Sequence, residues 1–244
     1  MNLGQRFIGV FTNPKETFSF LAEKPIWVDS LIIVLLITFA YGFLIAPFTA
    51  KDSFELLENS PKMKQQLRER IGEERFNNYL DNARKEAEST TPAYKIRSGL
   101  GVGIMTVIVI FLQSILLLVF SRLFSGSVQG NYPQLLSAMF HANFINQVLG
   151  NAVRFILIQA KQSVFKISTG LAIFFPRLEF NSSSYIILNN IDFFQLWMFG
   201  LLGYALSAIF KIELKKSLFI SYLFWALKTL INIGIGIWSI GRYQ

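Results

Sequence analysis

The chain has 244 residues, of which 52% are hydrophobic and only 16% are charged. This balance is typical of membrane proteins and excludes an ordinary soluble domain. Cysteine is absent, which excludes disulfides, thiolate metal sites and thiol nucleophiles. The net charge of +8 suits a bilayer with anionic headgroups and carries little information about nucleic acids. We therefore expect the lipid bilayer, and no nucleic acid, among the partners.

In residues 1–28, apolar side chains are interspersed with polar ones, which predicts an amphipathic segment before the first membrane span. Within it, the Asn13 side chain is suited to cap a helix whose first position is Pro14, because proline has no N–H to leave without a partner. Phe18 and Trp27 supply apolar surface on this segment. The pattern favours an interfacial helix that lies on the membrane surface, and a loosely ordered tail is the alternative.

Five later stretches are long and apolar enough to cross a bilayer. A hydrocarbon core about 30 Å thick needs roughly 20 helical residues, at about 1.5 Å per residue. The stretches are residues 30–50, 98–121, 134–158, 193–210 and 217–240. The sequence therefore predicts an all-α polytopic membrane protein that forms a single domain. Its core is a five-helix transmembrane bundle, preceded by the N-terminal interfacial helix.

The segment 51–97 is the only strongly polar part of the chain, and it separates the first two predicted spans. Pro61 divides it, and apolar residues then recur at helical spacing among mixed charges. This pattern predicts an extramembrane helical insert. It serves either as a solvated helix resting on the bundle or as a docking surface for a partner protein.

The distribution of Lys and Arg among the loops gives two opposite answers for the orientation of the chain in the membrane. Counting the insert favours an external N-terminus, whereas leaving out this nearly neutral segment favours an internal one by a narrow margin. The charge distribution alone therefore leaves the orientation open.

The third predicted span is unusually polar. It contains His141, Asn143, Asn146, Gln147, Asn151 and Arg154. Positions 143, 147, 151 and 154 share one face of a regular helix, so we expect a polar stripe that faces other helices or water. Three roles are open: interhelical hydrogen bonding, a hydrated path or headgroup groove, and a protein interface. We expect Arg154 to extend toward the membrane surface from the end of the helix.

A second polar feature is Lys228 at the middle of the last span, with Asn232 one turn further on. A charge at this depth marks a functional candidate, unless a tilted helix lets the ammonium group reach the surface. Gln113 and Gln195 are suited to extend the same polar interior. His141 is the only histidine and has no neighbouring carboxylate in the sequence, so no metal site is expected.

Catalytic patterns are missing from the spans. No paired carboxylates and no Ser-His-Asp arrangement occur there, and the glycines at 99, 101 and 103 lack the strand and lysine of a phosphate loop. We therefore expect a protein that is not an enzyme and needs no cofactor.

Short motifs along the chain resemble those of bacterial members of the Yip (Ypt-interacting protein) domain family. They are FTNPKETF at 11–18, KPIW at 24–27, the loop 126–136, residues 171–176, and IDFFQLW at 191–197. The resemblance covers nearly the whole chain in the expected order. It implies a five-helix membrane domain with a cytoplasmic N-terminus, and it carries over no catalytic residues.

The resemblance also implies where such a protein works. Eukaryotic relatives are associated with Golgi and ER membrane traffic and with small GTPases, and some bacterial relatives occur beside ABC-type exporters. We therefore expect an accessory or assembly protein of the bacterial cytoplasmic membrane that docks onto a transport or trafficking complex. The alternative is a small transporter, channel or lipid-handling protein with a polar cavity. A homo-oligomer is also open.

Overall fold

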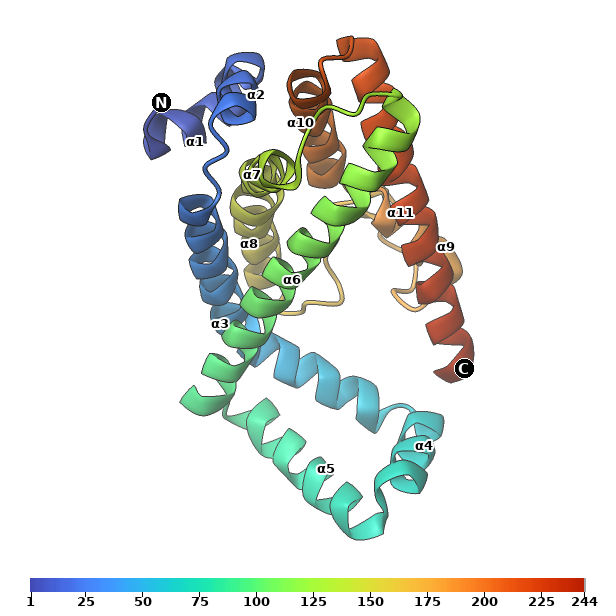
Figure 1. Cartoon of the computed structure of the whole chain (residues 1–244). Helices are drawn as coiled ribbons and strands as arrows, with labels where there is room; N and C mark the ends of the chain where they lie inside the picture. The colour runs from blue at the N-terminus through green and yellow to red at the C-terminus, as the bar shows by residue number, and fades with distance from the viewer. Residues whose placement is uncertain (244) are drawn as a thin grey trace.

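The structure is a computed structural model that describes residues 1–243, and every regular element in that range is helical (Figure 1). The helices are α1 (Leu3–Thr12), α2 (Pro14–Glu23), α3 (Val28–Glu58), α4 (Pro61–Ile71), α5 (Glu73–Glu88), α6 (Pro92–Ser125), α7 (Tyr132–Asn143), the π-helix η1 (Phe144–Gly150), α8 (Asn151–Lys161), the 3-10 helix η2 (Leu171–Phe174), α9 (Ser183–Asn190), α10 (Phe193–Phe210) and α11 (Leu214–Tyr243). The predicted all-α class is confirmed.

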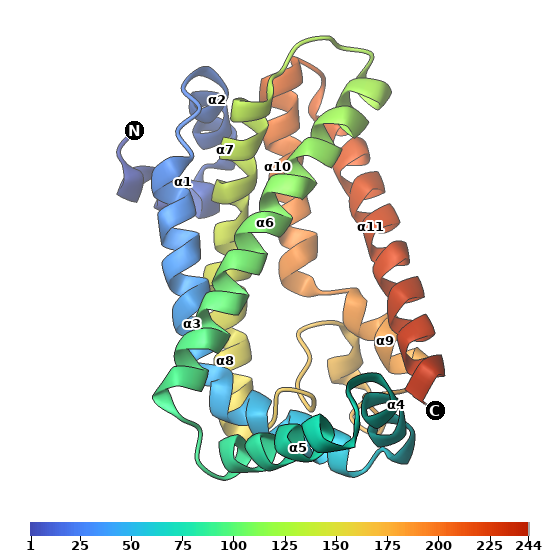
Figure 2. The ribbon, with the colours of Figure 1, turned by 60° about the horizontal axis from the view of Figure 1, so that its bottom comes forward.

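The long helices run between two ends of an elongated molecule (Figure 2). Helices α1 and α2 lie at one end, while α4, α5 and the C-terminus lie at the other. Within the residues that the structure describes, four helices are long and apolar enough to cross a membrane: α3, α6, α10 and residues 214–239 of α11. The chain is therefore a polytopic α-helical membrane protein, as its composition predicts.

The predicted third span, residues 134–158, differs from a simple helix. It consists of α7, η1 and α8 in sequence, so no single α-helix in it has the length of a span. Wider π-helical turns leave carbonyl groups free to bond elsewhere. Here the guanidinium of Arg154 donates to the carbonyl of Asn146 at 3.3 Å. We attribute the irregular π-helical segment η1 to this hydrogen bond from the Arg154 side chain.

The pair α3 and α6 makes the most extensive helix contact in the bundle. Ser98 donates from its hydroxyl to the carbonyl of Gly42 at 3.0 Å. A Cβ atom on Gly42 would lie 2.9 Å from Val102, so only glycine permits this approach. Both helices also extend beyond the predicted spans, because α3 continues through Pro47 to residue 58 and α6 begins at residue 92.

The insert forms two helices rather than one. Gly72 separates α4 from α5 with a φ of 85°, a conformation that favours glycine. Ser60 caps α4 by accepting from the amide of Met63, and Pro61 occupies the first turn. The insert is thus helical, as predicted, and α4 and α5 occupy residues 61–88 of it.

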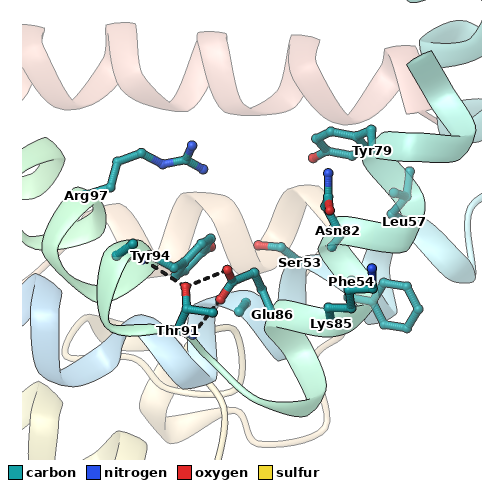
Figure 3. A pocket seen from close by; sticks show the side chains of 13 residues that line it. Ser53, Phe54, Leu57, Tyr79, Asn82, Lys85, Glu86, Thr91, Tyr94 and Arg97 are labelled. Carbon is teal, nitrogen blue, oxygen red and sulfur yellow. Dashed lines mark hydrogen bonds between the residues drawn. The ribbon is translucent and has the colours of Figure 1, made fainter.

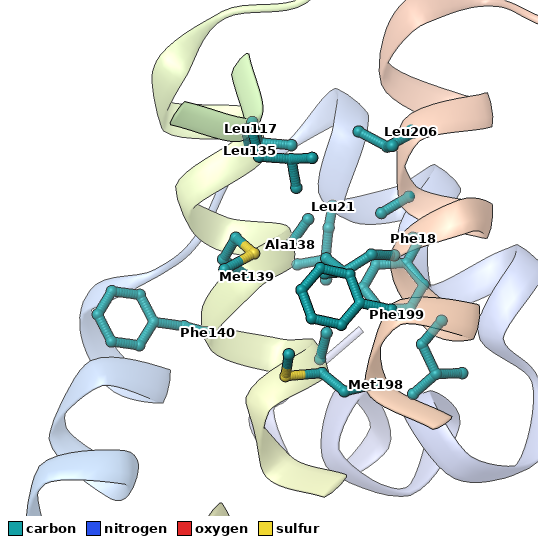
Figure 4. Close-up of a cluster of buried hydrophobic side chains, with 14 of the residues drawn as sticks. Phe18, Leu21, Leu117, Leu135, Ala138, Met139, Phe140, Met198, Phe199 and Leu206 are labelled. Carbon is teal, nitrogen blue, oxygen red and sulfur yellow. The ribbon is translucent and has the colours of Figure 1, made fainter. Parts of the chain in front are cut away.

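The hydrophobic core joins the N-terminal helices to α7 and α10 (Figure 4). Phe18 and Leu21 of α2 are almost fully buried, and they pack in one cluster with Met139 and Phe199. The apolar face of α2 therefore packs on protein. Trp27 also packs inward, stacking on Phe140 with a centroid distance of 6.5 Å.

One local expectation about the N-terminus is wrong. The Asn13 side chain caps no backbone amide and instead donates to the Glu16 carboxylate, because the Asn13 backbone has φ −144° and ψ 66°. Pro14 does occupy the first turn of α2, as predicted.

The segment 162–192 is anchored to α3 by the Asp52 side chain and is stabilised internally by Tyr185. The Asp52 carboxylate on α3 accepts from the hydroxyl of Ser163 at 2.8 Å and from the amides of Val164 at 2.6 Å and Phe165 at 3.1 Å. Tyr185 on α9 donates to the carbonyl of Ile167 at 3.0 Å. Burial raises the pKa of the Tyr185 hydroxyl, which keeps it a neutral donor.

Candidate functional site

Arg154 on α8 lies at the centre of a polar network inside the bundle. Its guanidinium forms an ion pair with Asp192 at 3.1 Å and donates to the hydroxyl of Thr169 at 3.1 Å. The Arg154 side chain is 18% exposed and that of Asp192 is 8% exposed. A buried carboxylate at the start of α10 therefore holds Arg154, and its extension toward the membrane surface stays a prediction.

Polar residues that precede Arg154 in the sequence accept further hydrogen bonds from its guanidinium. Arg154 donates to the side-chain oxygens of Asn146 at 2.9 Å and Asn151 at 3.0 Å. Asn151 in turn donates to Gln147 at 3.2 Å. Three members of the predicted stripe, at 147, 151 and 154, are thus brought together. Asn143 is excluded from it, because it donates to the Met139 carbonyl one turn back and η1 changes the register between them.

Asp192 extends the network to the last two membrane helices. One of its carboxylate oxygens caps α10 by accepting from the amide of Gln195 at 2.9 Å. The side-chain oxygen of Gln195 accepts from the ammonium of Lys228 on α11 at 2.8 Å. Lys228 also lies 5.6 Å from the ring centroid of Phe199. Asp192 interacts electrostatically with Lys228, so the polar chain links α8, α10 and α11.

A separate polar cluster ties α1 to the bundle through His141. The Nδ1–H of His141 donates to the Ser137 carbonyl at 2.8 Å, which makes Nε2 the acceptor of the Ser30 hydroxyl at 2.9 Å. Arg6 of α1 lies 3.4 Å from the same Nε2 and forms an ion pair with Asp29 of α3. His141 and Ser30 are fully buried, and Arg6 is 3% exposed.

Two predicted site residues lie outside both clusters. Gln113 is partly buried on α6, and its side chain makes no hydrogen bond within residues 1–243. Asn232 is exposed on α11, one turn beyond Lys228.

The predicted site does not include five residues that the folded chain adds to these clusters: Arg6, Asp29, Ser30, Thr169 and Asp192. For Asp192 a signal was present, since a carboxylate directly before an apolar helix is a common N-cap. Across residues 1–243, no group of three or more His, Cys, Asp or Glu side chains could hold a metal ion.

Two pockets lie on the insert side of the molecule. One of about 710 Å³ is bounded by the ends of α3 and α5 and the start of α6 (Figure 3), with Phe54, Tyr79 and Arg97 in its wall. The other, of about 890 Å³, lies where α3 meets α4, and Phe165 and Lys166 line it.

The fold and its internal polar network define a polytopic membrane protein whose charged side chains hold its helices together. A family model described as the Yip1 domain matches residues 8–236, nearly the whole chain. The chain therefore belongs to the Yip1 domain family, which confirms the resemblance of its motifs. Neither the curated proteins nor the solved structures compared with it yield a significant match.

Proposed function

We propose that this chain is a non-enzymatic accessory or assembly protein that docks onto a membrane transport complex of the ABC-exporter type, or onto a trafficking complex. We place it in the bacterial cytoplasmic membrane with a cytoplasmic N-terminus. The observation that carries the proposal is the insert, a firmly held helical pair that projects from the end of the bundle opposite to α1 and α2 (Figure 2).

Contacts within the insert support a rigid shape. Phe76 is 1% exposed, and the guanidinium of Arg68 lies 4.9 Å from its ring centroid. Arg68 also pairs with Glu73 across the turn at 2.9 Å. At the far end of α5, Glu86 accepts from both the amide and the hydroxyl of Thr91 at 2.7 Å, beside the pocket (Figure 3). A rigid surface loses little entropy when a partner binds.

The outer surface of the insert has the composition of a polar interface. Charged residues such as Arg75 and Lys85 are exposed on α5, and Tyr79 is 51% exposed at the rim of the pocket. Aromatic residues beside a pocket, surrounded by charges, are typical anchors of protein interfaces. Tyr79 is therefore the residue that we expect to contribute most to docking.

Co-purification in mild detergent from the native membrane tests this function. We expect a stoichiometric membrane complex with the wild type, its loss with Tyr79→Ala, and its retention with Asn78→Ala, an exposed neighbour on the same helix. A solitary chain under these conditions contradicts the accessory role. Equal recovery of the complex with both variants contradicts docking through the insert.

A small transporter, channel or lipid-handling protein is the second candidate, and the position of Lys228 inside the bundle favours it. Liposome flux and lipid-scrambling assays decide this alternative. It requires activity in the wild type that falls with Lys228→Leu and with Gln147→Leu. Absence of activity in the wild type contradicts it.

A further inference from the structure

The pocket of about 710 Å³ between α3, α5 and α6 adjoins the ends of two membrane spans. Its wall includes Ala50, the last residue of the uncharged segment 30–50, and Arg97, which directly precedes the uncharged segment 98–121. Both helices therefore leave the hydrocarbon core beside this pocket. Helix α5 crosses the same end of the bundle and supplies another wall (Figure 2). The pocket thus lies where lipid headgroups meet the protein.

The cations around this pocket lack carboxylate partners. Four side chains on α5 and α6 have no acidic group within 4 Å among residues 1–243: Arg84, Lys85, Lys95 and Arg97. The Arg97 guanidinium lies 5.7 Å from the ring centroid of Tyr94, and that of Arg84 lies 5.8 Å from the ring centroid of Phe54. Contact with a ring face positions a guanidinium and leaves its N–H groups free to donate to an anion.

Glu86 is the one acidic side chain in the wall of this pocket, and it already has partners. Its two carboxylate oxygens accept from the amide and the hydroxyl of Thr91, each at 2.7 Å (Figure 3). The wall also contains Lys85 and Arg97, so it carries one more positive charge than negative. The guanidinium of Arg97 makes no hydrogen bond or ion pair within residues 1–243, which leaves five N–H donors for a ligand.

The rest of the wall is suited to an amphipathic ligand. Tyr94 provides a phenolic hydroxyl next to Arg97, and this hydroxyl has no hydrogen-bond partner in the described part of the chain. Phe54 and Leu57 provide apolar surface in the same pocket. The pocket volume lies within the range of about 300–1,000 Å³ that is usual for small-molecule sites.

These features favour an anionic phospholipid over other ligands. The fork of an arginine matches the oxygens of a phosphate, and a phenol donates a further hydrogen bond. Apolar wall residues are suited to contact the start of the acyl chains. A lipid reaches this pocket from the adjoining bilayer, where its local concentration is far above that of a soluble anion. The net charge of +8 favours an anionic lipid over a zwitterionic one.

We propose that this pocket binds the phosphate headgroup of an anionic phospholipid such as phosphatidylglycerol, with Arg97 as the phosphate ligand and Tyr94 as a second donor. Arg97 and Tyr79 lie at opposite ends of the pocket (Figure 3). A lipid held by Arg97 therefore leaves the rim at Tyr79 accessible to a protein. The inference goes beyond the proposed docking function and does not depend on it.

Native mass spectrometry of the full-length protein in mild detergent tests the proposal. The protein is titrated with phosphatidylglycerol or phosphatidylcholine of identical acyl chains, and the Kd of the first bound lipid is compared. We expect the wild type to bind phosphatidylglycerol at least tenfold more tightly. Arg97→Gln should abolish this preference, and Tyr94→Phe should lower it about threefold, as expected for one hydrogen bond. Arg75→Gln removes an exposed charge of α5 that does not line the pocket, and it should leave the preference unchanged.

Three results overturn the proposal. One is equal affinity of the wild type for the two lipids, which decides the matter even if a variant does not fold. The second is the same preference in folded Arg97→Gln and in Arg75→Gln. The third is displacement of phosphatidylglycerol by millimolar inorganic phosphate or by a hexaglutamate peptide, which would assign the pocket to a soluble anion or to an acidic protein segment.

Failure of this inference and failure of the proposed function are distinguishable, because the lipid titration uses the purified chain without a partner. A missing partner complex with a retained lipid preference contradicts the proposed function alone. An intact complex without a lipid preference contradicts this inference alone.

Discussion

The guanidinium of Arg154 and the carboxylate of Asp192 lie 3.1 Å apart, although 38 residues separate them in the sequence. This ion pair joins the irregular third membrane segment to the start of α10. Through Gln195 the same carboxylate connects to Lys228 on α11. One acidic side chain thus connects polar groups on α8, α10 and α11.

Removing the charge of Asp192 should be more damaging than removing that of Arg154. Asp192→Asn leaves two cations without a carboxylate, and breaking a buried pair in this way costs about 3–5 kcal/mol. Arg154→Leu costs less, because Asp192 keeps its capping bond to Gln195 and its interaction with Lys228. Titration with a denaturing detergent measures both free energies of unfolding. Glu179→Gln, at an exposed position, is the control and should change little.

A related asymmetry should hold for the pair that anchors α1. Asp29→Asn leaves Arg6 buried with an unpaired charge, whereas Arg6→Met leaves a carboxylate that is one-third exposed to solvent. We expect a loss of about 2–3 kcal/mol for Asp29→Asn and about 1 kcal/mol for Arg6→Met.

Hydrogen exchange of residues 3–23 measures whether α1 and α2 detach from the bundle. Lys15→Met on the exposed side of α2 is the matched control. Equal exchange in Asp29→Asn and Arg6→Met would contradict the predicted order.

Asp52 should control the segment that follows α8. Its carboxylate accepts three hydrogen bonds from residues 163–165, and bonds to a charged group contribute about 1.5–3 kcal/mol each. In Asp52→Ala we expect the amides of Val164 and Phe165 to exchange at least tenfold faster. Glu55→Ala, which removes only an exposed contact with Lys51 at 3.9 Å, should leave their exchange unchanged.

The absence of cysteine allows a direct test of topology. Single cysteines at Ser19, Gln129 and Asn78 all occupy exposed positions. Helix α2 and the loop after α6 lie at one end of the bundle, and α5 lies at the other (Figure 2). An impermeant maleimide added to intact cells should therefore label Asn78→Cys, and it should label Ser19→Cys and Gln129→Cys only after lysis. The reverse pattern would contradict the cytoplasmic N-terminus.

Hydrophobic stretches and proline positions in the sequence correctly predicted the helices, because helix formation depends on residues that are close together in the chain. The uncharged stretches form long helices because an α-helix hydrogen-bonds its own backbone N–H and C=O groups, which an apolar environment requires. Pro61 lies in the first turn of α4, the part of a helix where proline is tolerated. The predicted stripe failed at Asn143, because helical spacing assumes a regular α-helix and η1 interrupts it. The capping role of Asn13 failed because its backbone conformation depends on how α1 and α2 pack.

The amino-acid sequence by itself determined the membrane class, the helical elements, the family and the identity of most polar residues inside the bundle. Hydrophobicity and helical periodicity act over a few neighbouring residues, so they can be read from the chain. Tertiary structure alone decided the partners: Arg154 with Asp192, Lys228 with Gln195, and Arg6 with Asp29 and His141. A buried charge takes the nearest complementary group in space, and that group is set by how distant helices pack.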